Sequence, residues 1–275
     1  MEGMIVDGPG SFPTAVRCLP AKEDKYDGIE VDILKFPSSD VSAFEDSLRL
    51  SLEQWRSQKK KGVWLKLPIE YCDFVPAAIK GGFTYHHAEA TYVMLNLWLG
   101  DGPCTLPANA SHTIGVGAFV LNDKGEILAV QERYGLFKDK WKMPSGCLNQ
   151  GEDIFAGAIR EVKEETGIET EFVEVIGFRQ SHGGAFGKSD LYFLCVLRPL
   201  TSTITVQTAE LVDAKWVPLA EYKAQPYLSE RKMLGRMLDV CIETSTAPAR
   251  KGFKLENVQA GTKRAPQYFY NNTSQ

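Results

Sequence analysis

The sequence has little that would direct the protein to a membrane, to secretion or to a disulfide-stabilised scaffold. Its 275 residues contain no hydrophobic run near the roughly 18 residues that a membrane-spanning helix needs. Residues 1–19 form neither an Arg-rich amphipathic stretch nor an apolar signal segment. The six cysteines are widely spaced and include no Cys-x-x-Cys pair, which is typical of reduced thiols. We therefore expect a cytoplasmic protein that does not bind membranes.

A strong charge of one sign is lacking too. The formal net charge is −4 at pH 7, so no general positive field would attract nucleic acid. Hydrophobic residues make up 44% of the chain and charged residues 24%, which is ordinary for a globular protein. A highly anionic ligand would need its own local basic groups. We expect a small-molecule substrate and no nucleic acid partner.

The N-terminal part of the chain predicts a small α/β domain. Residues 1–25 are rich in glycine and proline, and we expect them to be loosely ordered. From residue 26 to residue 102 the hydrophobic spacing changes repeatedly between strand and helix periods, which predicts a βαβαβ unit. The expected elements are strands at 28–35, 61–67, 83–85 and 91–98 and helices at about 39–55 and 70–81.

A second domain is expected over residues 111–245. Asp101–Pro103 and Pro107 interrupt the hydrophobic pattern and mark the boundary. The residues Asn122–Gly125 form a good hairpin turn between the first two strands. The tail, residues 246–275, is polar and basic, and we expect it to be irregular. The expected elements are strands at 113–121, 127–131, 171–180, 190–198 and 215–218 and helices at about 153–166 and 228–243.

The segment from Gly146 to Ile168 carries the strongest chemical pattern. On a helix, Glu161, Glu164 and Glu165 fall at i, i+3 and i+4 and share one face. Their mutual repulsion costs a few tenths of a kcal/mol per pair, and Arg160 supplies only one positive charge. Magnesium binds such oxygen ligands and also binds substrate phosphates. A bound cation would lower the pKa of a coordinated water and so make a nucleophile.

The length of the pattern separates a functional site from a solvated acidic helix face. The hexapeptide Arg-Glu-Val-Lys-Glu-Glu alone is of a common type, so by itself it indicates only a solvated helix face. The whole segment, however, fits Gly-x5-Glu-x7-Arg-Glu-U-x-Glu-Glu-x-Gly-U at all nine positions, where U is a bulky aliphatic residue. Ordinary residue frequencies give on the order of one chance match in ten million for a chain of this length. The pattern therefore favours a functional site.

This segment resembles the signature box of the Nudix hydrolases, which cleave a nucleoside diphosphate linked to another moiety. The resemblance implies a pyrophosphohydrolase that uses magnesium or manganese, with an α/β/α sandwich around a mixed sheet. It makes Glu161, Glu164, Glu165 and the Gly146 carbonyl the metal ligands, and Glu164, Glu165 and Arg160 the catalytic residues. The box residues, of which Arg160 and Glu152 would hold loop and helix together, are Gly146, Glu152, Arg160, Glu161, Glu164, Glu165 and Gly167.

The resemblance extends beyond the box and covers roughly residues 25–245. It points to the plant cytosolic Nudix enzymes that hydrolyse ADP-ribose and NADH, and to the vertebrate Nudix protein encoded antisense to a fibroblast growth factor gene. In the plant enzymes the N-terminal unit helps to form a homodimer, so the resemblance implies a homodimer here. The similar segments are 64–68, 82–89, 108–112, 178–182 and 185–190, the last being nearer to the vertebrate protein.

Basic and aromatic side chains near the box are candidate substrate contacts. Lys138 and Lys142 flank Trp141, so the ammonium groups could meet phosphates and the indole could stack on a base. Alternatively, the lysines lie in a solvated loop and Trp141 lies in the core. Arg179 ends a strand and could clamp a phosphate through two hydrogen bonds. We predict these four residues as substrate-binding.

The general base stays open at this point. Glu164 is one candidate because two of the implied ligands flank it, and Glu210 is another. His182 could carry a proton near neutral pH, although surface histidines are common. His86 and His87 have no further ligands near them in sequence, which favours a structural or dimer role over metal binding.

Three functions remain after these considerations. The leading one is a pyrophosphohydrolase that releases AMP from ADP-ribose or NADH. A second keeps the chemistry and changes the substrate to an inositol pyrophosphate, a CoA ester or a prenyl diphosphate, because the box contacts only diphosphate and metal. A third is a non-catalytic nucleotide-binding regulator, which would have no chemical need for the intact set of carboxylates.

Overall fold

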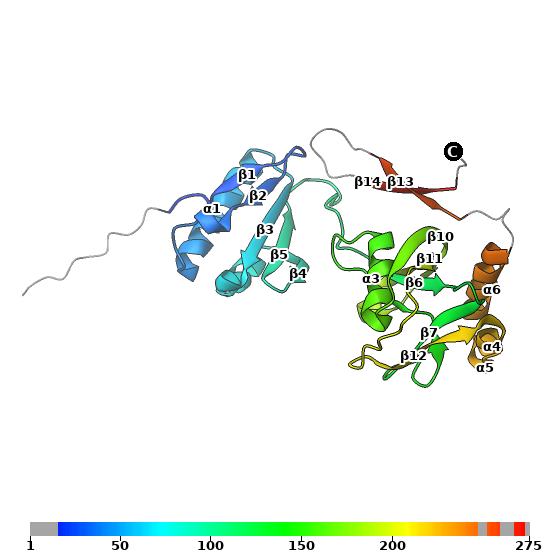
Figure 1. The fold of residues 1–275 in the computed structure, drawn as a ribbon. Coiled ribbons are helices and arrows are strands. Elements are labelled where there is room, and N and C mark those ends of the chain that lie inside the picture. Colours follow the sequence, from blue (N-terminus) through cyan, green and yellow to red (C-terminus); the bar gives the residue numbers. More distant parts are fainter. Residues whose placement is uncertain (1–15, 247–251, 259–266, 273–275) are drawn as a thin grey trace, which may run out of the picture. The chain divides into compact units, whose positions relative to one another are not determined.

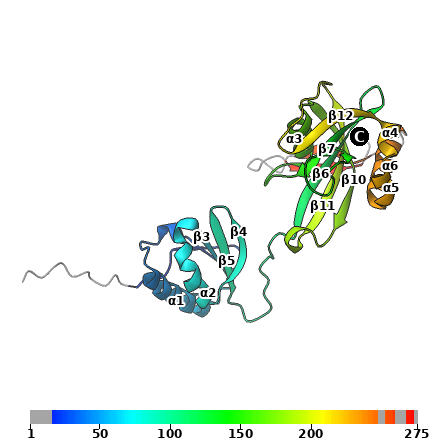
Figure 2. The ribbon, with the colours of Figure 1, turned by 90° about the horizontal axis from the view of Figure 1, so that it is seen from below.

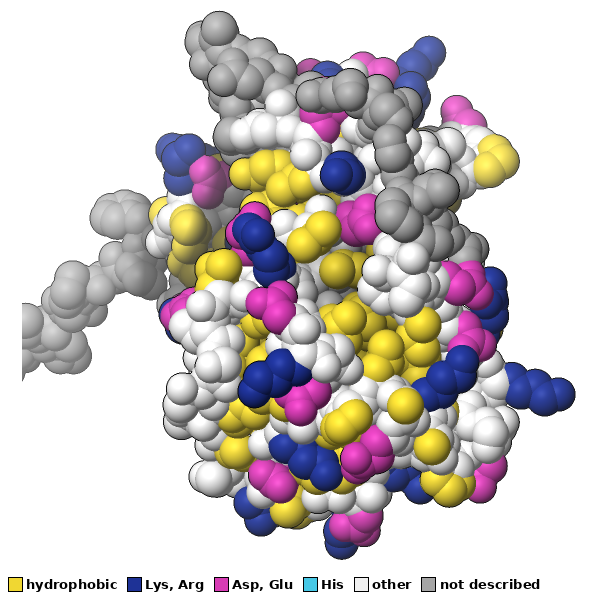
Figure 3. Space-filling model, turned by 45° about the vertical axis from the view of Figure 1, so that its right-hand side comes forward, with side chains coloured by type: hydrophobic (Ala, Val, Ile, Leu, Met, Phe, Trp, Pro, Cys, Tyr) yellow, Lys and Arg dark blue, Asp and Glu magenta, His cyan; other side chains and the backbone are white. Residues whose placement is uncertain are grey.

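The computed structural model describes residues 16–246, 252–258 and 267–272. The chain divides into two compact units, residues 1–110 and 111–275, and each is described by itself. Within the described residues, no helix is both long and apolar enough to cross a membrane. On the face in Figure 3, lysines and arginines stand among aspartates and glutamates, so that neither sign forms a continuous field.

A five-stranded mixed sheet forms the N-terminal unit (Figure 1). Its strands are β1 (Ala21–Glu23), β2 (Ile29–Val31), β3 (Gly62–Pro68), β4 (Thr84–Glu89) and β5 (Tyr92–Trp98). They stand in the order β1-β2-β3-β5-β4. Strands β2 and β3 are parallel, and the other neighbours are antiparallel. This arrangement agrees with the α/β fold class that the sequence predicts.

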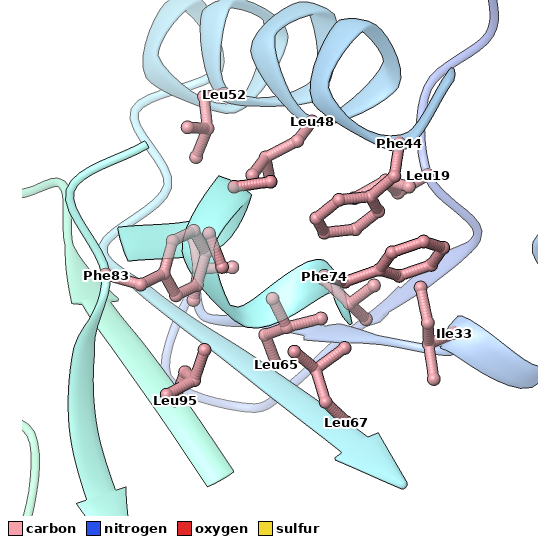
Figure 4. Close-up of a cluster of buried hydrophobic side chains, with 14 of the residues drawn as sticks. Leu19, Ile33, Phe44, Leu48, Leu52, Leu65, Leu67, Phe74, Phe83 and Leu95 are labelled. Carbon is pink, nitrogen blue, oxygen red and sulfur yellow. The ribbon is translucent and has the colours of Figure 1, made fainter. Parts of the chain in front are cut away.

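Two helices bury the core of this unit against the sheet. Helix α1 (Val41–Ser57) begins after Asp40, whose carboxylate accepts a hydrogen bond from the Ala43 N–H at 2.7 Å, a normal helix cap. Its Phe44 ring stacks on Phe74, with ring centroids 4.3 Å apart. Figure 4 shows both rings above the side chains of strand β3. Truncating either ring to alanine would cost about 3–5 kcal/mol of stability.

Two elements of this unit differ from their sequence-based prediction, and the second difference has an identifiable reason. The strand expected over 28–35 ends at Val31 and continues as the 3-10 helix η1 (Ile33–Lys35). The helix expected over 70–81 is divided into the 3-10 helix η2 (Ile69–Phe74) and helix α2 (Val75–Lys80). Pro76 stands in the first turn of α2, where its missing N–H is tolerated, and this placement begins a new helix.

The region expected to be loosely ordered, residues 1–25, is ordered in its last part. Strand β1 pairs with β2, and the Leu19 side chain is buried in the core. Residues 1–15 of that region lie outside the described residues.

Two sheets form the centre of the C-terminal unit. Its strands are β6 (His112–Val120), β7 (Glu126–Glu132), β8 (Trp141–Lys142), β9 (Ser145–Cys147), β10 (Thr170–Ser181), β11 (Ser189–Pro199) and β12 (Leu211–Pro218). One sheet has the order β10-β11-β6-β9 and the other the order β12-β7-β8. Strands β6 and β11 are parallel and their neighbours are antiparallel, so the sheet is mixed as expected.

Helices lie on both sides of these strands, as Figure 2 shows. On one side, α3 (Ile154–Thr166) buries Ala158 and Val162 against Val116 of β6. On the other side, Leu238 packs near Phe119 of the same strand. Alternate β6 residues therefore serve opposite layers, and the predicted α/β/α sandwich is confirmed. The second layer consists of α4 (Leu219–Lys223), α5 (Pro226–Glu230) and α6 (Lys232–Thr246).

The tail expected to be irregular contains a hairpin in its described parts. Strands β13 (Lys254–Val258) and β14 (Gln267–Asn271) pair antiparallel. The Phe253 backbone forms a bridge with Val175 of β10, which fixes the hairpin to the C-terminal unit. The consecutive aromatic residues Tyr268, Phe269 and Tyr270 favour a strand, although a strand of five residues gives a weak sequence signal. The short 3-10 helix η3 (Ala185–Gly187) joins β10 to β11.

Candidate functional site

The loop before α3 and the helix itself bring the box residues together. Strand β9 pairs with β6, so that Gly146 lies opposite Val116. A Cβ added to Gly146 would overlap the Glu161 carboxylate, so a larger residue here would have to displace that carboxylate. At the other end, Gly167 has φ 70° and its N–H bonds to the Lys163 carbonyl at 2.8 Å, which ends the helix.

Arg160 uses all five of its N–H groups to hold this arrangement. Its Nε and Nη2 donate to the two Glu152 carboxylate oxygens at 2.7 and 2.8 Å, and Nη2 also donates to the Cys147 carbonyl at 3.0 Å. Nη1 donates to Glu161 at 2.8 Å and to Glu164 at 3.0 Å. Hydrogen bonds from Arg160 lower the pKa of Glu152. The geometry is that of a connection between loop and helix, as the resemblance implies for Arg160 and Glu152.

Glu165 occupies a different environment on the same helix. Its side chain points to the Ser145 N–H, at 3.2 Å, and to the Lys142 ammonium, at 3.9 Å. Only 7% of the residue is exposed, and this burial raises the pKa of its carboxyl to about 8, although Lys142 and the Ser145 N–H act in the opposite direction. Burial therefore favours the protonated form of Glu165.

Lys142 is buried among acceptors and does not lie in a solvated loop. Its ammonium is 2.8 Å from a Glu132 carboxylate oxygen and 2.9 Å from the Ser145 hydroxyl. Its residue is 8% exposed. Sequence reasoning missed Glu132 and Ser145. The position of Glu132 at the end of strand β7 was a signal that could have identified it. The pairing of β7 with β8 could not have been predicted, because β8 has only two residues.

The carboxylates suit a hard divalent cation by their chemistry, although their side chains are arranged around Arg160 and Lys142. Among the described residues, no three His, Cys, Asp or Glu side chains stand close enough together to hold a metal. Burial nevertheless raises the pKa of Glu161 as well as that of Glu165. A cation favours the ionised form and would offset this desolvation. Carboxylate and carbonyl oxygens such as those of Glu161, Glu164, Glu165 and Gly146 are the donor type that magnesium and manganese prefer.

Two of the four predicted substrate contacts meet in one pocket beside this site. The pocket has a volume of about 110 Å³ and is lined by Lys142, Ser145 and Arg179 among its polar residues. Arg179 pairs with Asp190 at 3.0 Å and donates to the Ser181 hydroxyl at 2.9 Å. Most of the lining is apolar or aromatic, with Phe137, Met143, Tyr192, Tyr222, Tyr227 and Leu238 among its members.

The other two predicted contacts are placed elsewhere. Trp141 is partly buried against the hydrophobic core, and the Lys215 ammonium lies 4.3 Å from the centroid of its ring. Its carbonyl accepts a hydrogen bond from the Tyr227 hydroxyl at 2.7 Å. The Lys138 residue is exposed. Neither residue lines the pocket that Lys142 and Arg179 share.

The remaining candidates for proton transfer make their hydrogen bonds outside the box. His182 bonds to the Ser189 hydroxyl at 2.8 Å, and the Glu210 carbonyl accepts from the Arg133 N–H at 2.9 Å. In the part of the chain that the structure describes, no hydrogen bond or ion pair joins either residue to the box. His86 and His87 belong to the N-terminal unit, where their Nδ1 atoms lie 2.6 Å apart. The position of Glu164, beside Arg160 and largely exposed, keeps it as a candidate base.

Comparison with known proteins gives matches along most of the chain. The family model of the Nudix hydrolase domain matches residues 19–99, and that of the NUDIX domain matches residues 111–236. Nudix hydrolase 8 of Arabidopsis thaliana is 53% identical over 247 residues, which is 88% of this chain and 67% of that protein. Nudix hydrolase 2 of the same plant is 44% identical over 263 residues, 95% of this chain and 94% of that protein. The human nucleoside diphosphate-linked moiety X motif 6 is 40% identical over 213 residues, covering 75% and 67%.

Proposed function

The chain belongs to the Nudix hydrolase family and is a pyrophosphohydrolase, and we propose that it hydrolyses ADP-ribose or NADH and releases AMP. Nudix hydrolases generally require divalent metal ions, and we propose magnesium or manganese for this chain. The observation that carries the proposal is the pocket shared by Lys142 and Arg179 beside the buried Glu165. It joins cationic groups for a diphosphate to an aromatic lining for a base.

The pocket supports a substrate with one anionic and one aromatic part. Lys142 and Arg179 offer charge-assisted hydrogen bonds to phosphate oxygens. Phe137, which is partly exposed, offers aromatic surface for a planar ring, and the buried rings of Tyr222 and Tyr227 lie behind it in the lining. A nucleoside diphosphate derivative has both parts, and the name of the human relative refers to a nucleoside diphosphate-linked moiety. The segments at 64–68 and 178–182 support the more specific assignment to ADP-ribose or NADH.

The carboxylates and Arg160 would hold the cation and set its position. A bound cation would neutralise phosphate oxygens and supply a water of lowered pKa. Glu161, Glu164 and Glu165 would hold it with the Gly146 carbonyl, all four being oxygen donors. Arg160 keeps Glu161 and Glu164 on one guanidinium nitrogen, so that both carboxylates present their second oxygens in a fixed direction. Glu164, whose side chain is 58% exposed, can accept a proton from water.

The experiment that tests this function is a substrate panel with the intact protein. With magnesium or manganese present, ADP-ribose and NADH should give AMP. Glu165→Gln should lower kcat by about 100-fold or more without unfolding the protein, since it removes a carboxylate that would hold the cation. Glu171→Gln, a change of the same chemistry at an exposed residue paired with Arg198, should leave kcat unchanged. The substrate assignment is wrong if the purified protein leaves both compounds intact.

The lining of the pocket favours a second candidate within the same chemistry. Met143, Leu234 and Leu238 make much of the surface apolar. Such a surface suits CoA esters or prenyl diphosphates better than inositol pyrophosphates, whose attached group is polar and highly charged. The same panel separates these substrates from ADP-ribose. Tight nucleotide binding with no turnover of any of them would favour the non-catalytic regulator instead.

We also propose that the N-terminal unit forms a homodimer. Val63, Leu65 and Leu67 of β3 face the buried core, so the alternate residue Trp64 lies on the opposite face of the sheet. Met94 of β5, opposite Lys66, lies on that same half-exposed face. Met94→Lys should shift sedimentation from dimer to monomer. Ile79→Lys, which changes an exposed residue of α2, should not.

The proposed location is the cytoplasm. All six cysteines are free in the structure, and Cys195 and Cys241 are buried. Free thiols are typical of reducing compartments. Fractionation of cells that express the protein would test this location.

A further inference from the structure

We propose that the tail hairpin β13–β14 is a positioning element for the site, acting through Tyr270 on the first turn of α3. The inference rests on the proposed role of α3, whose Glu161, Glu164 and Glu165 carry the chemistry. It concerns a part of the chain outside the box and outside residues 111–236, which the NUDIX domain model matches.

The first observation is a hydrogen bond from the helix to the tail. The first four N–H groups of a helix have no partner within it. Asp153 stands at the cap position of α3 but its side chain makes no cap hydrogen bond. The Phe155 N–H donates instead to the Tyr270 hydroxyl at 3.3 Å, across 115 residues of sequence. Tyr270 therefore takes part of the role that a local cap usually has.

A cluster of aromatic rings surrounds that hydrogen bond. The centroid of the Phe155 ring is 5.0 Å from that of Tyr268 and 6.1 Å from that of Phe172. Phe172 of β10 lies in turn 6.3 Å from Tyr270. All three pairs are edge-to-face, a favourable geometry for aromatic rings. Helix, sheet and hairpin thus meet at one place, and burial raises the pKa of Tyr270 to about 12, so its hydroxyl stays protonated.

The hairpin is seated on β10 through its backbone. Phe253 and Val175 exchange two N–H···O bonds of 2.7 and 3.0 Å. The Gly252 N–H donates to Glu174 at 2.9 Å, and this carboxylate is buried. A Cβ at Gly252 would stand 2.6 Å from the Val175 carbonyl oxygen, so the seat accepts only glycine. The contact is therefore specific and can be removed at a residue remote from the box.

A short path links this contact to the carboxylates. Phe155 follows Glu152 by three residues, so both belong to the turn that enters α3. Glu152 receives two hydrogen bonds from Arg160, and Arg160 in turn bonds Glu161 and Glu164. A first turn that frays would loosen Glu152 and with it the orientation of both carboxylates. The substrate pocket lies on other elements and is not on this path.

The test compares full-length variants by kinetics and by amide hydrogen exchange. Tyr270→Phe keeps the ring and removes the hydroxyl, whereas Gly252→Val unseats the hairpin. We expect Tyr270→Phe to speed exchange at residues 152–166 and to lower kcat for ADP-ribose with magnesium by about fivefold, the effect of one lost cap hydrogen bond. The KM should stay unchanged, and Gly252→Val should give larger effects. Tyr268→Phe, which also removes one hydroxyl from β14, should match the wild type.

Two results would overturn the inference. One is amide exchange at the wild-type rate at residues 152–166 in Tyr270→Phe. The other is faster exchange in this variant together with an unchanged kcat, measured at a temperature well below the unfolding midpoint. The second result would make the hairpin a stabilising element only. If Gly252→Val fails to fold, Tyr270→Phe still decides the question. If the wild type hydrolyses no ADP-ribose, the substrate assignment fails. The kinetics of the variants are then measured on the compound of the panel that is cleaved. The exchange measurement does not depend on the substrate.

Discussion

Replacing Glu165 with glutamine should remove a pH-dependent loss of stability that burial imposes on the metal-free protein. The Glu165 carboxyl has a pKa raised from 4.5 to about 8, first because it is buried and only partly offset by Lys142. An acid whose pKa is raised by folding stabilises the folded state most at low pH. This contribution is complete below pH 4.5 and is lost as the pH rises through about 8. Glutamine is neutral at every pH and cannot show this dependence.

The size of the effect follows from the two pKa values. A rise from 4.5 to about 8 corresponds to an upper limit of about 5 kcal/mol, because one pKa unit is worth about 1.4 kcal/mol. Between pH 5.5 and pH 8.0 the unfolded carboxyl is already ionised and the folded one becomes half ionised. Linkage then gives a loss of about 3 kcal/mol over this window.

Urea unfolding with a chelator present, followed at several pH values from 5.5 to 8.0, measures this difference. The free energy of unfolding of the wild type should fall relative to Glu165→Gln by up to about 3 kcal/mol across the window. Glu164→Gln is the matched control, since its side chain is 58% exposed, and its curve should run parallel to that of the wild type. Adding magnesium should reduce the wild-type loss, because a cation favours the ionised carboxylate. Parallel curves for the wild type and Glu165→Gln would refute the reasoning and would mean that Lys142 keeps the buried carboxylate ionised.

Three further predictions concern the loop, the guanidinium and the pocket. Gly146→Ala should lower kcat by more than about tenfold in a folded protein, since its methyl group would displace the Glu161 carboxylate, whereas Gly102→Ala, in open space, should have no effect. Arg160→Lys should lower both the thermal midpoint and kcat, because one ammonium cannot replace five directed N–H donors; equal kcat in the two proteins would contradict this. Arg179→Ala should raise the KM for ADP-ribose about tenfold with a smaller change in kcat, which steady-state kinetics will show; an unchanged KM would remove Arg179 from the binding site.

The box could be predicted from sequence because its geometry is local. Helical periodicity alone places Glu161, Glu164 and Glu165 on neighbouring positions, and the structure has them on a helix within one residue of the expected bounds. The resemblance to Nudix hydrolases is confirmed by matches to the family models and to plant and human relatives. The pairing of Arg160 with Glu152, which the resemblance implies, spans only eight residues and is present.

Contacts across long stretches of sequence could not be predicted in this way. Lys142 could be identified as a cation near the box, but its position between Glu132 and Glu165 depends on the register of β7 against β8, a strand of only two residues. The partner of Arg179, Asp190, depends on the register of β10 against β11. Register is set by the packing of whole strands, and single residues carry little information about it.

The balance of charge explains why a bound cation could be inferred from the sequence more easily than the geometry of its ligands. Five carboxylates converge on two cationic side chains, Arg160 and Lys142, and they belong to Glu132, Glu152, Glu161, Glu164 and Glu165. Two positive charges against five negative ones leave an excess of three, or of two when Glu165 is protonated. Water cannot screen that excess fully, since Glu165 is buried and Glu161 is partly buried. A diphosphate entering beside them would add further negative charge, and the proposed divalent cation would offset this repulsion. The acidic excess can be counted directly from the sequence. Which oxygens would coordinate a cation depends on how many of the ion pairs of Arg160 and Lys142 would break when it binds.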